Sequence, residues 1–214
     1  MKDKENLVKT GTTTVGIVCK DGIVLAADRR ATAGYMISSK KFEKVVPITN
    51  NIAVTMAGLV SDAQLIIKII KAQLKLNSIR RSKEPSVKEA ANLLGSLVYH
   101  NIRRFSVVPG IVGFLLAGKD NTGFYLYNLG VDGSITTADD YESDGSGSPF
   151  AIGVLESSYT KNMSVNDGVK LAVKAINTAL QRDIASGNGI DVFTITKDGV
   201  KKVLEREIET KLQI

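Results

Sequence analysis

The stretch from residue 13 to residue 27, TTVGIVCKDGIVLAA, decides the fold class, because it predicts a β-hairpin near the start of the chain. Its two halves, 13–20 and 23–27, are rich in strand-forming residues. Between them lies Asp21-Gly22, and an Asp-Gly pair in that position favours a tight turn with positive φ. An antiparallel pair of strands is therefore expected here.

Further strand patterns lie outward from this hairpin in groups, at 44–48, 52–57, 110–118, 123–129, 134–138, 190–196 and 200–204. A first helix follows the early group, because one face of the next segment is apolar at a spacing of three and four residues: Ala63, Ile66, Ile67, Ile70 and Leu74. Two more helices are expected, at 86–105 and 165–185.

Their ends carry capping signals. Ser86 and Glu89 form a capping box, Ser164 is the expected N-cap of the third helix, and Gly187 is its expected C-cap. The strands are grouped and do not alternate regularly with helices, which favours an α+β fold of antiparallel sheets covered by segregated helices.

Composition narrows the class of protein. The chain has 214 residues, enough for one domain, and its formal charge of +6 is spread along the sequence, so no nucleic-acid partner is expected. Cys19 is the only cysteine, which fits a reducing compartment. Residues 1–11 lack a secretory apolar core, and the longest apolar stretch, 107–118, falls short of the ~18 residues that a membrane span needs. A soluble cytoplasmic protein is expected.

The chemistry can be approached by elimination. His100 is the only histidine, and it lies inside the second helical pattern, where an ordinary helix residue is the simpler interpretation. No cluster has the spacing of metal ligands and no phosphate-binding loop is present, so neither a metal nor another cofactor is expected. Nucleophiles that work without histidine remain.

Thr12 can supply such a nucleophile if it becomes an N-terminus. An α-amino group has a pKa near 7.7–8.0, so it can act as the base for the hydroxyl on the same residue. Gly11 has no side chain and leaves its carbonyl open to attack by that hydroxyl. We therefore expect residues 1–11 to be a propeptide removed by self-cleavage at Gly11-Thr12, and 12–214 to be one catalytic domain. The simpler alternative is a threonine-rich start of a strand.

Five motifs in chain order add a resemblance. They are 12–16 (TTTVG), 26–32 (AADRRAT), 56–63 (MAGLVSDA), 145–150 (GSGSPF) with 153–156 (GVLE), and 182–187 (RDIASG). This set, spread over residues 11 to about 200, resembles catalytic β-subunits of archaeal-type proteasomes, in the N-terminal nucleophile hydrolase superfamily. A shorter bacterial ATP-dependent relative also starts with two threonines but lacks the 145–150 segment in this form. The resemblance implies a four-layer α-β-β-α sandwich.

The resemblance also implies site residues. Thr12 matches the nucleophile, Asp28 the acid after the second strand, and Lys44 the active-site lysine. The residues around the threonine amine match Ser146, Asp183 and Ser186. Asp183 has interest of its own, because it lies in the last turn of the predicted helix on the core face, and a buried acid needs a partner. Without the resemblance, Asp28 and Lys44 would be taken as a surface ion pair.

Substrate contacts follow in the same way. The Gly58 backbone N–H matches the oxyanion donor, although the position also suits a turn glycine. Thr32, Gly58 and Val60 match positions where a substrate strand adds to a sheet edge. The pocket for the residue before the cut bond matches Ala31, Met56 and Val46, which are apolar and suit hydrophobic side chains.

The assembly implied is a barrel of seven-membered rings with other β-subunits, a ring of α-subunits and an ATPase regulator that feeds unfolded polypeptides. Two alternatives remain open. One is a non-catalytic structural β-subunit of the same ring. The other is a basic nucleic-acid-binding module, which only the positive charge supports.

Overall fold

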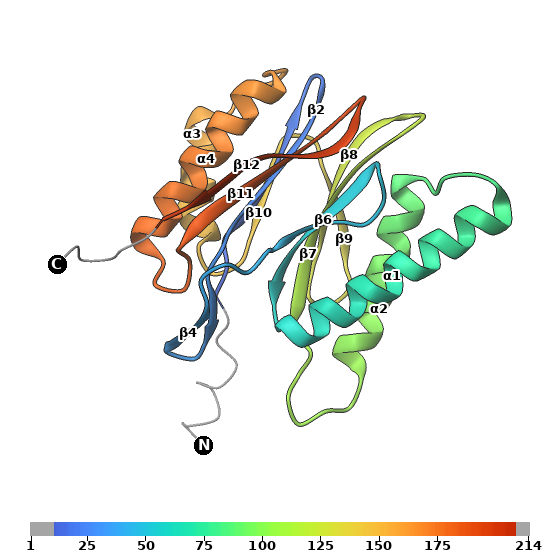
Figure 1. Cartoon of the computed structure of the whole chain (residues 1–214), viewed down its shortest axis with the longest axis horizontal. Helices are drawn as coiled ribbons and strands as arrows, with labels where there is room; N and C mark the ends of the chain where they lie inside the picture. The colour runs from blue at the N-terminus through green and yellow to red at the C-terminus, as the bar shows by residue number, and fades with distance from the viewer. Residues whose placement is uncertain (1–10, 209–214) are drawn as a thin grey trace.

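The computed structural model describes residues 11–208, and their strands form two five-stranded sheets that face each other (Figure 1). The first sheet has the order β10 (Tyr141–Asp144), β1 (Thr14–Cys19), β2 (Gly22–Asp28), β11 (Gly189–Thr196) and β12 (Gly199–Glu207). The second has the order β5 (Val45–Pro47), β6 (Ile52–Gly58), β7 (Val112–Asp120), β8 (Gly123–Leu129) and β9 (Ile135–Ala138). All neighbouring strands are antiparallel.

Two pairs of helices cover the outer faces of the sheets. The first sheet carries α3 (Ser148–Ser158) and α4 (Val165–Arg182), and the second carries α1 (Val60–Arg81) and α2 (Val87–Arg103). The four layers in Figure 1 confirm the predicted α-β-β-α sandwich. A separate hairpin of β3 (Ala31–Ala33) and β4 (Met36–Ser39) projects at one end of it.

The side chains of β2 show why both faces of a sheet are covered. Val24 and Ala26 point into the core beneath α4, while Ile23, Leu25 and Ala27 point into the core between the sheets. Alternate residues of a strand face opposite sides, so a continuous apolar run requires cover on both. The predicted hairpin is confirmed, with Cys19 opposite Gly22 across its turn.

Several element ends differ from the sequence-based expectations. The second helix ends at Arg103, and Phe105 beyond it is 99% exposed. The third predicted helix, α4, ends at Arg182, so Asp183 rather than Gly187 is its C-cap. The helical period continues past both ends, but the backbone at Arg104 and at Asp183 is extended and stops the helices.

Four elements were not predicted. The strands β3 and β4 form a short hairpin whose second strand is exposed, β10 is a short edge strand, and α3 is only 11 residues long with a single acidic side chain. Short elements show too few repeats of a period to be recognised. The expected caps Ser86, with Glu89, and Ser164 are present and accept the backbone N–H bonds assigned to them.

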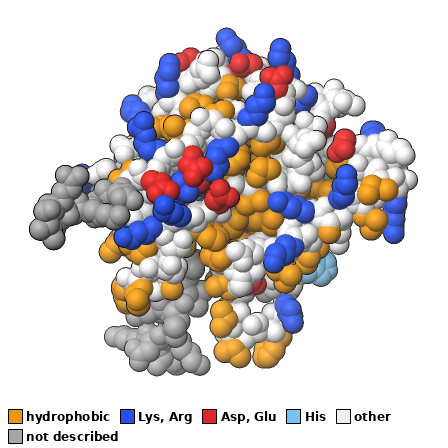
Figure 2. Space-filling model, viewed as in Figure 1, with side chains coloured by type: hydrophobic (Ala, Val, Ile, Leu, Met, Phe, Trp, Pro, Cys, Tyr) orange, Lys and Arg blue, Asp and Glu red, His pale blue; other side chains and the backbone are white. Residues whose placement is uncertain are grey.

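None of the helices in the described part of the chain is long and apolar enough to cross a membrane. Figure 2 shows lysine and arginine side chains distributed over the visible face, with acidic side chains between them.

Candidate active site

Thr12 lies two residues before β1, the strand between β10 and β2. The residue is 5% exposed. Its hydroxyl donates a hydrogen bond to the Gly11 carbonyl oxygen at 2.7 Å. The predicted nucleophile and the bond that it is expected to cut are therefore already in contact.

Lys44 reaches this junction from the other sheet, where it precedes β5. Its Nζ lies 2.6 Å from Asp28 Oδ1 and 3.4 Å from the Gly11 carbonyl oxygen. Lys44 and Asp28 are 2% and 0% exposed, so their pair is buried and the alternative of a surface ion pair is wrong. Burial lowers the pKa of Lys44, and the Asp28 charge opposes that shift.

Asp28 is held by more than the lysine. Its carboxylate accepts backbone hydrogen bonds from Thr13 at 2.9 Å, Arg30 at 3.0 Å and Gly187 at 2.9 Å. These three backbone N–H groups hold the Asp28 carboxylate in place independently of Lys44. Such a carboxylate can orient the ammonium group of Lys44 toward the Gly11 carbonyl.

A second cluster surrounds the backbone nitrogen of Thr12. Ser146 Oγ accepts a hydrogen bond from that N–H at 3.2 Å and donates one to Asp183 Oδ2 at 2.6 Å. Ser186 Oγ donates to the same carboxylate oxygen at 2.6 Å and lies 2.7 Å from Thr13 Oγ1. The structure thus brings Ser146, Asp183 and Ser186 together next to Thr12.

Two glycines on either side of Ser146 allow this close approach. A Cβ on Gly145, which has φ +99°, would lie 2.2 Å from the Thr12 carbonyl oxygen, and one on Gly147 would lie 1.9 Å from Thr13 Oγ1. Gly147 also donates its N–H to the Thr12 carbonyl at 3.2 Å. The Gly-Ser-Gly sequence lets the backbone wrap around Thr12 without side-chain collisions.

A pocket opens beside the Gly11-Thr12 junction. Gly58 contributes to it from the end of β6, where φ is +113° and a Cβ would lie 2.3 Å from the Ile111 carbonyl oxygen. Thr32 also contributes, and its hydroxyl accepts the Gly11 N–H at 3.1 Å. The full lining is Gly11, Thr12, Ala31, Thr32, Phe42, Lys44, Met56, Gly58 and Val60.

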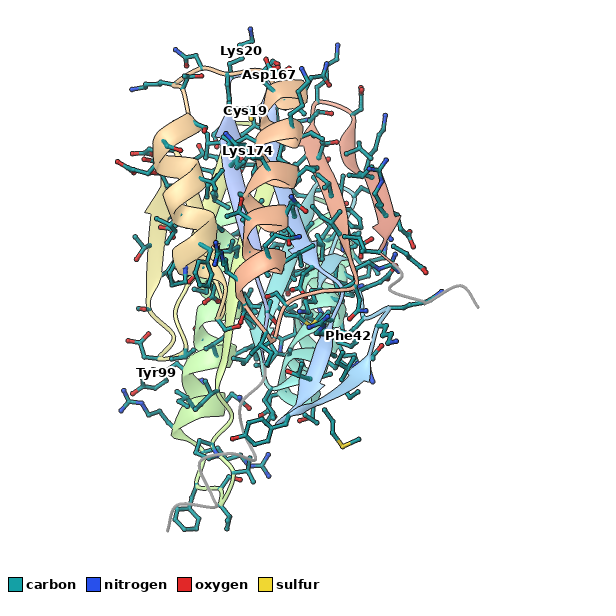
Figure 3. The ribbon with its side chains drawn as sticks, turned by 90° about the vertical axis from the view of Figure 1, so that its left-hand side faces the viewer. Cys19, Lys20, Phe42, Tyr99, Asp167 and Lys174 are labelled. Atoms are coloured by element: carbon teal, nitrogen blue, oxygen red, sulfur yellow. The ribbon has the colours of Figure 1, made fainter. Side chains whose placement is uncertain are left out.

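The expected substrate residues fall here with one exception and one addition. Val46 does not line the pocket but packs against the core beneath α1 and α2. Phe42 does line it, from the segment between β4 and β5 (Figure 3). Phe42 lies two residues before Lys44, the spacing that puts two side chains on the same side of a strand, so this spacing could have identified Phe42.

His100 lies outside this cluster. It is an exposed residue of α2, and its Nδ1 lies 2.6 Å from the Ser96 carbonyl oxygen of the same helix. It is therefore an ordinary helix residue, as the sequence pattern suggested.

Comparisons with known proteins agree with this arrangement. The four-layer sandwich with a threonine at the head of a central strand defines the N-terminal nucleophile hydrolase fold. A family model described as "Proteasome subunit" matches residues 8–195, and the chain belongs to this family.

Proteasome β-subunits from archaea are among the similar proteins. A proteasome subunit beta of Archaeoglobus profundus is 44% identical over 205 residues, which cover 96% of this chain and 94% of the relative. One of Methanothermobacter thermautotrophicus is 42% identical over 214 residues, which cover 100% and 99%. Proteasome β-subunits are generally proteases, and the family assembles in rings with other proteasome subunits.

Proposed function

We propose that this chain is the precursor of a catalytic proteasome β-subunit, a threonine-type endopeptidase that frees Thr12 by cutting its own bond to Gly11. One observation carries the proposal. The Thr12 hydroxyl contacts the Gly11 carbonyl beside a buried Lys44–Asp28 pair. A structural subunit has no need to bury two opposite charges there, because a buried ion pair is a weak source of stability.

Self-cleavage can be followed atom by atom. Thr12 Oγ1 attacks the Gly11 carbonyl carbon, and Lys44 Nζ stabilises the charge that develops on the carbonyl oxygen. The C–N bond then breaks, the nitrogen takes up the proton of the hydroxyl, and an ester joins Gly11 to Thr12 Oγ1. Water hydrolyses this ester, which leaves a Gly11 carboxylate and a free Thr12 amine.

Peptide hydrolysis reuses the same groups. The free amine accepts the proton of the Thr12 hydroxyl, which attacks the carbonyl carbon of a substrate, and the Gly58 N–H stabilises the oxyanion. The amine product leaves with that proton, and water hydrolyses the acyl-enzyme ester. Ser146, Asp183 and Ser186 position the amine, while Asp28 orients Lys44.

Substrate would lie as an extended strand along Thr32, Gly58 and Val60, as Gly11 lies against Thr32 in this chain. The apolar lining by Ala31, Phe42 and Met56 suits a hydrophobic residue before the cut bond. We place the working particle in the cytoplasm, as β-rings stacked on α-rings and supplied with unfolded polypeptides by an ATPase.

The test compares assembled particles in which this chain is the only β-subunit. With the wild-type chain, intact mass should show the loss of residues 1–11, and a peptide with a hydrophobic residue before the cut should be hydrolysed. Thr12→Ala should keep residues 1–11 and lose at least about 1,000-fold in hydrolysis, because the nucleophile is gone. Thr12→Ser keeps a hydroxyl and should still be processed. Equal hydrolysis by the Thr12→Ala particle would show that Thr12 is not the nucleophile.

A further inference from the structure

Asp144 is an acid close to Thr12 that the mechanism above does not use. It is the last residue of β10 and pairs with Thr14 of β1, and residues paired in this way lie on the same face of a sheet. Val15 and Ile17 face the α3/α4 side of β1, so Thr14 faces the second sheet. Thr12 lines a pocket together with Met56 and Gly58 of that second sheet.

The position of the carboxyl group agrees with that register. Asp144 Oδ2 approaches Gly113 of β7 so closely that a Cβ on that glycine would lie 2.5 Å away. Asp144 is therefore between the two sheets. Thr12 lies two residues before the Thr14–Asp144 pair, and a Cβ on Gly145, the residue after Asp144, would lie 2.2 Å from the Thr12 carbonyl oxygen. The Cα atoms of Thr12 and Asp144 are therefore at most about 12 Å apart.

Few groups compensate its charge. Asp144 Oδ1 accepts the Gly145 N–H at 2.7 Å, and none of the ion pairs within residues 11–208 includes Asp144. Burial raises its pKa, and the Gly145 hydrogen bond opposes the shift. Its field is consequently weakly screened on the side that faces the second sheet.

The neighbouring elements bring few other charges to it. From β1 and β7, Thr14 and Gly113 face Asp144, and neither ionises. The acidic residue of α3 bonds Tyr141 at the other end of β10, and Glu142 bonds Asn128 of β8. The charged groups that face Thr12 itself are Lys44, Asp28 and, through Ser146, Asp183.

We propose that Asp144 is a positioning residue that sets the pH at which the Thr12 amine becomes a base. This inference rests on the proposed function, because it concerns the amine freed by cleavage. A negative charge at this distance favours the protonated amine, so the amine loses its proton at a higher pH than it would beside a neutral residue. Asp144 thereby fixes the acid limb of the pH–rate profile.

The test uses Asp144→Asn, which keeps an oxygen for the Gly145 N–H and removes the charge. In processed particles, the pH dependence of Thr12 amine acylation by acetic anhydride is read by mass spectrometry, alongside the pH profile of kcat/KM. Both midpoints should fall by about one pH unit, the size expected for one charge at this distance in a partly buried site. Asp144→Ser, also neutral and able to accept the Gly145 N–H, should give the same shift.

Asp120→Asn is the matched control, since Asp120 also accepts backbone hydrogen bonds but at the opposite end of β7 from Gly113. It should leave both midpoints in place. If the particles hydrolyse peptide but the acylation and kcat/KM midpoints are the same for wild type and both Asp144 variants, the inference is overturned and the proposed function stands. If the acylation midpoint of the Thr12 amine shifts in particles that hydrolyse no peptide, the effect of the Asp144 charge on the amine is upheld and the proposed function is refuted.

Discussion

At the scale of single residues, Gly11 does more than leave its carbonyl open to attack, because the surrounding structure has no room for a side chain at this position. A Cβ at this position would lie 1.7 Å from the Cβ of Ala185 and 2.8 Å from its Cα. Ala185 belongs to the segment after α4 that also carries Asp183 and Ser186. The loop that surrounds Thr12 therefore leaves space only for glycine at position 11.

A Gly11→Ala chain should self-cleave about 100-fold more slowly, because a shift of about 1 Å between reacting groups costs about that factor. Intact mass followed through assembly measures the rate. Ala185→Gly in the same chain should restore part of it, since one Cβ of the colliding pair is removed. Ala185→Gly alone serves as the control and should process normally. Processing of Gly11→Ala at the wild-type rate would contradict this steric account.

Asp183 directs the hydrogen bonds around Thr12. A carboxylate can only accept, so both Ser146 and Ser186 donate their single hydroxyl proton to it. Ser146 Oγ then receives the Thr12 N–H, and Thr13 Oγ1 donates to Ser186. On the proposed mechanism, Ser146 remains an acceptor after cleavage, which leaves the lone pair of the amine available for the Thr12 hydroxyl.

At the scale of elements, the contact between α4 and β1 depends on one glycine. Gly168 of α4 lies over Cys19 at the end of β1, and a Cβ there would be 2.6 Å from the thiol sulfur. Cys19 is enclosed between this helix and the sheet, close to Asp167 (Figure 3). Burial, then the charges of Asp21 and Asp167, raise the pKa of the thiol from 9.0 to about 12.

Cys19 should therefore report on the docking of α4. At pH 8 the folded chain should react with iodoacetamide about 1,000-fold more slowly than the unfolded chain, because the thiolate is the reactive form. Gly168→Ala should displace α4 and speed the reaction, whereas Gly153→Ala, with nothing within 4 Å of its Cβ, should not. Equal rates for the two variants would refute the packing argument.

The same shift has a consequence for stability. The folded chain keeps the Cys19 proton, while the unfolded chain releases it above pH 9.0. The contribution of the thiol is thus complete below pH 9.0 and is lost as the pH rises toward about 12. Urea midpoints measured between pH 8 and pH 11 should fall more steeply for wild type than for Cys19→Ala.

Elements and site were predictable from the sequence to different degrees. The hairpin around Asp21-Gly22 and the faces of α1 and α2 follow from local turn chemistry and periodicity. Long-range contacts carry no such local signal. The elimination of histidine chemistry pointed to Thr12, but its partners came from the family resemblance, because Asp28, Lys44 and Ser146 meet only through strand pairing between distant segments. Asp144 was missed because the strand that carries it, β10, was not predicted.

At the scale of the whole molecule, an ionic cluster centred on the buried pair Arg29 and Asp191 ties the last strand to the site. Arg29, which follows Asp28, is 4% exposed and pairs with Asp191 of β11 at 3.6 Å and Glu205 of β12 at 2.9 Å. Lys202 of β12 approaches the other Asp191 oxygen at 3.4 Å. Burial raises the pKa of Asp191, and the charges of Arg29 and Lys202 oppose the shift. Ion pairs thus hold the segment after β2 against β11 and β12.

Arg29→Met should lower the free energy of unfolding of the full chain by about 3–5 kcal/mol, because it leaves Asp191 buried without its main partner. Urea unfolding measures the change. Arg29→Met with Asp191→Leu should recover much of it by removing both charges. Lys201→Met is the control, since Lys201 is 60% exposed and its pair with Asp198 spans 3.7 Å, so a change of about 0–1 kcal/mol is expected. A loss no larger than the control's would contradict the role of Arg29.

The contact between the Thr12 hydroxyl and the Gly11 carbonyl has a consequence for whole populations of this protein. On the proposed mechanism, each molecule can perform that first reaction once, and nothing in the fold restores the severed bond. The ratio of long to short chains in a cell extract is then a permanent record of how many molecules have completed their site. When this ratio is measured at intervals after protein synthesis is stopped, its decline gives the rate at which particles mature, and no substrate is needed for the measurement.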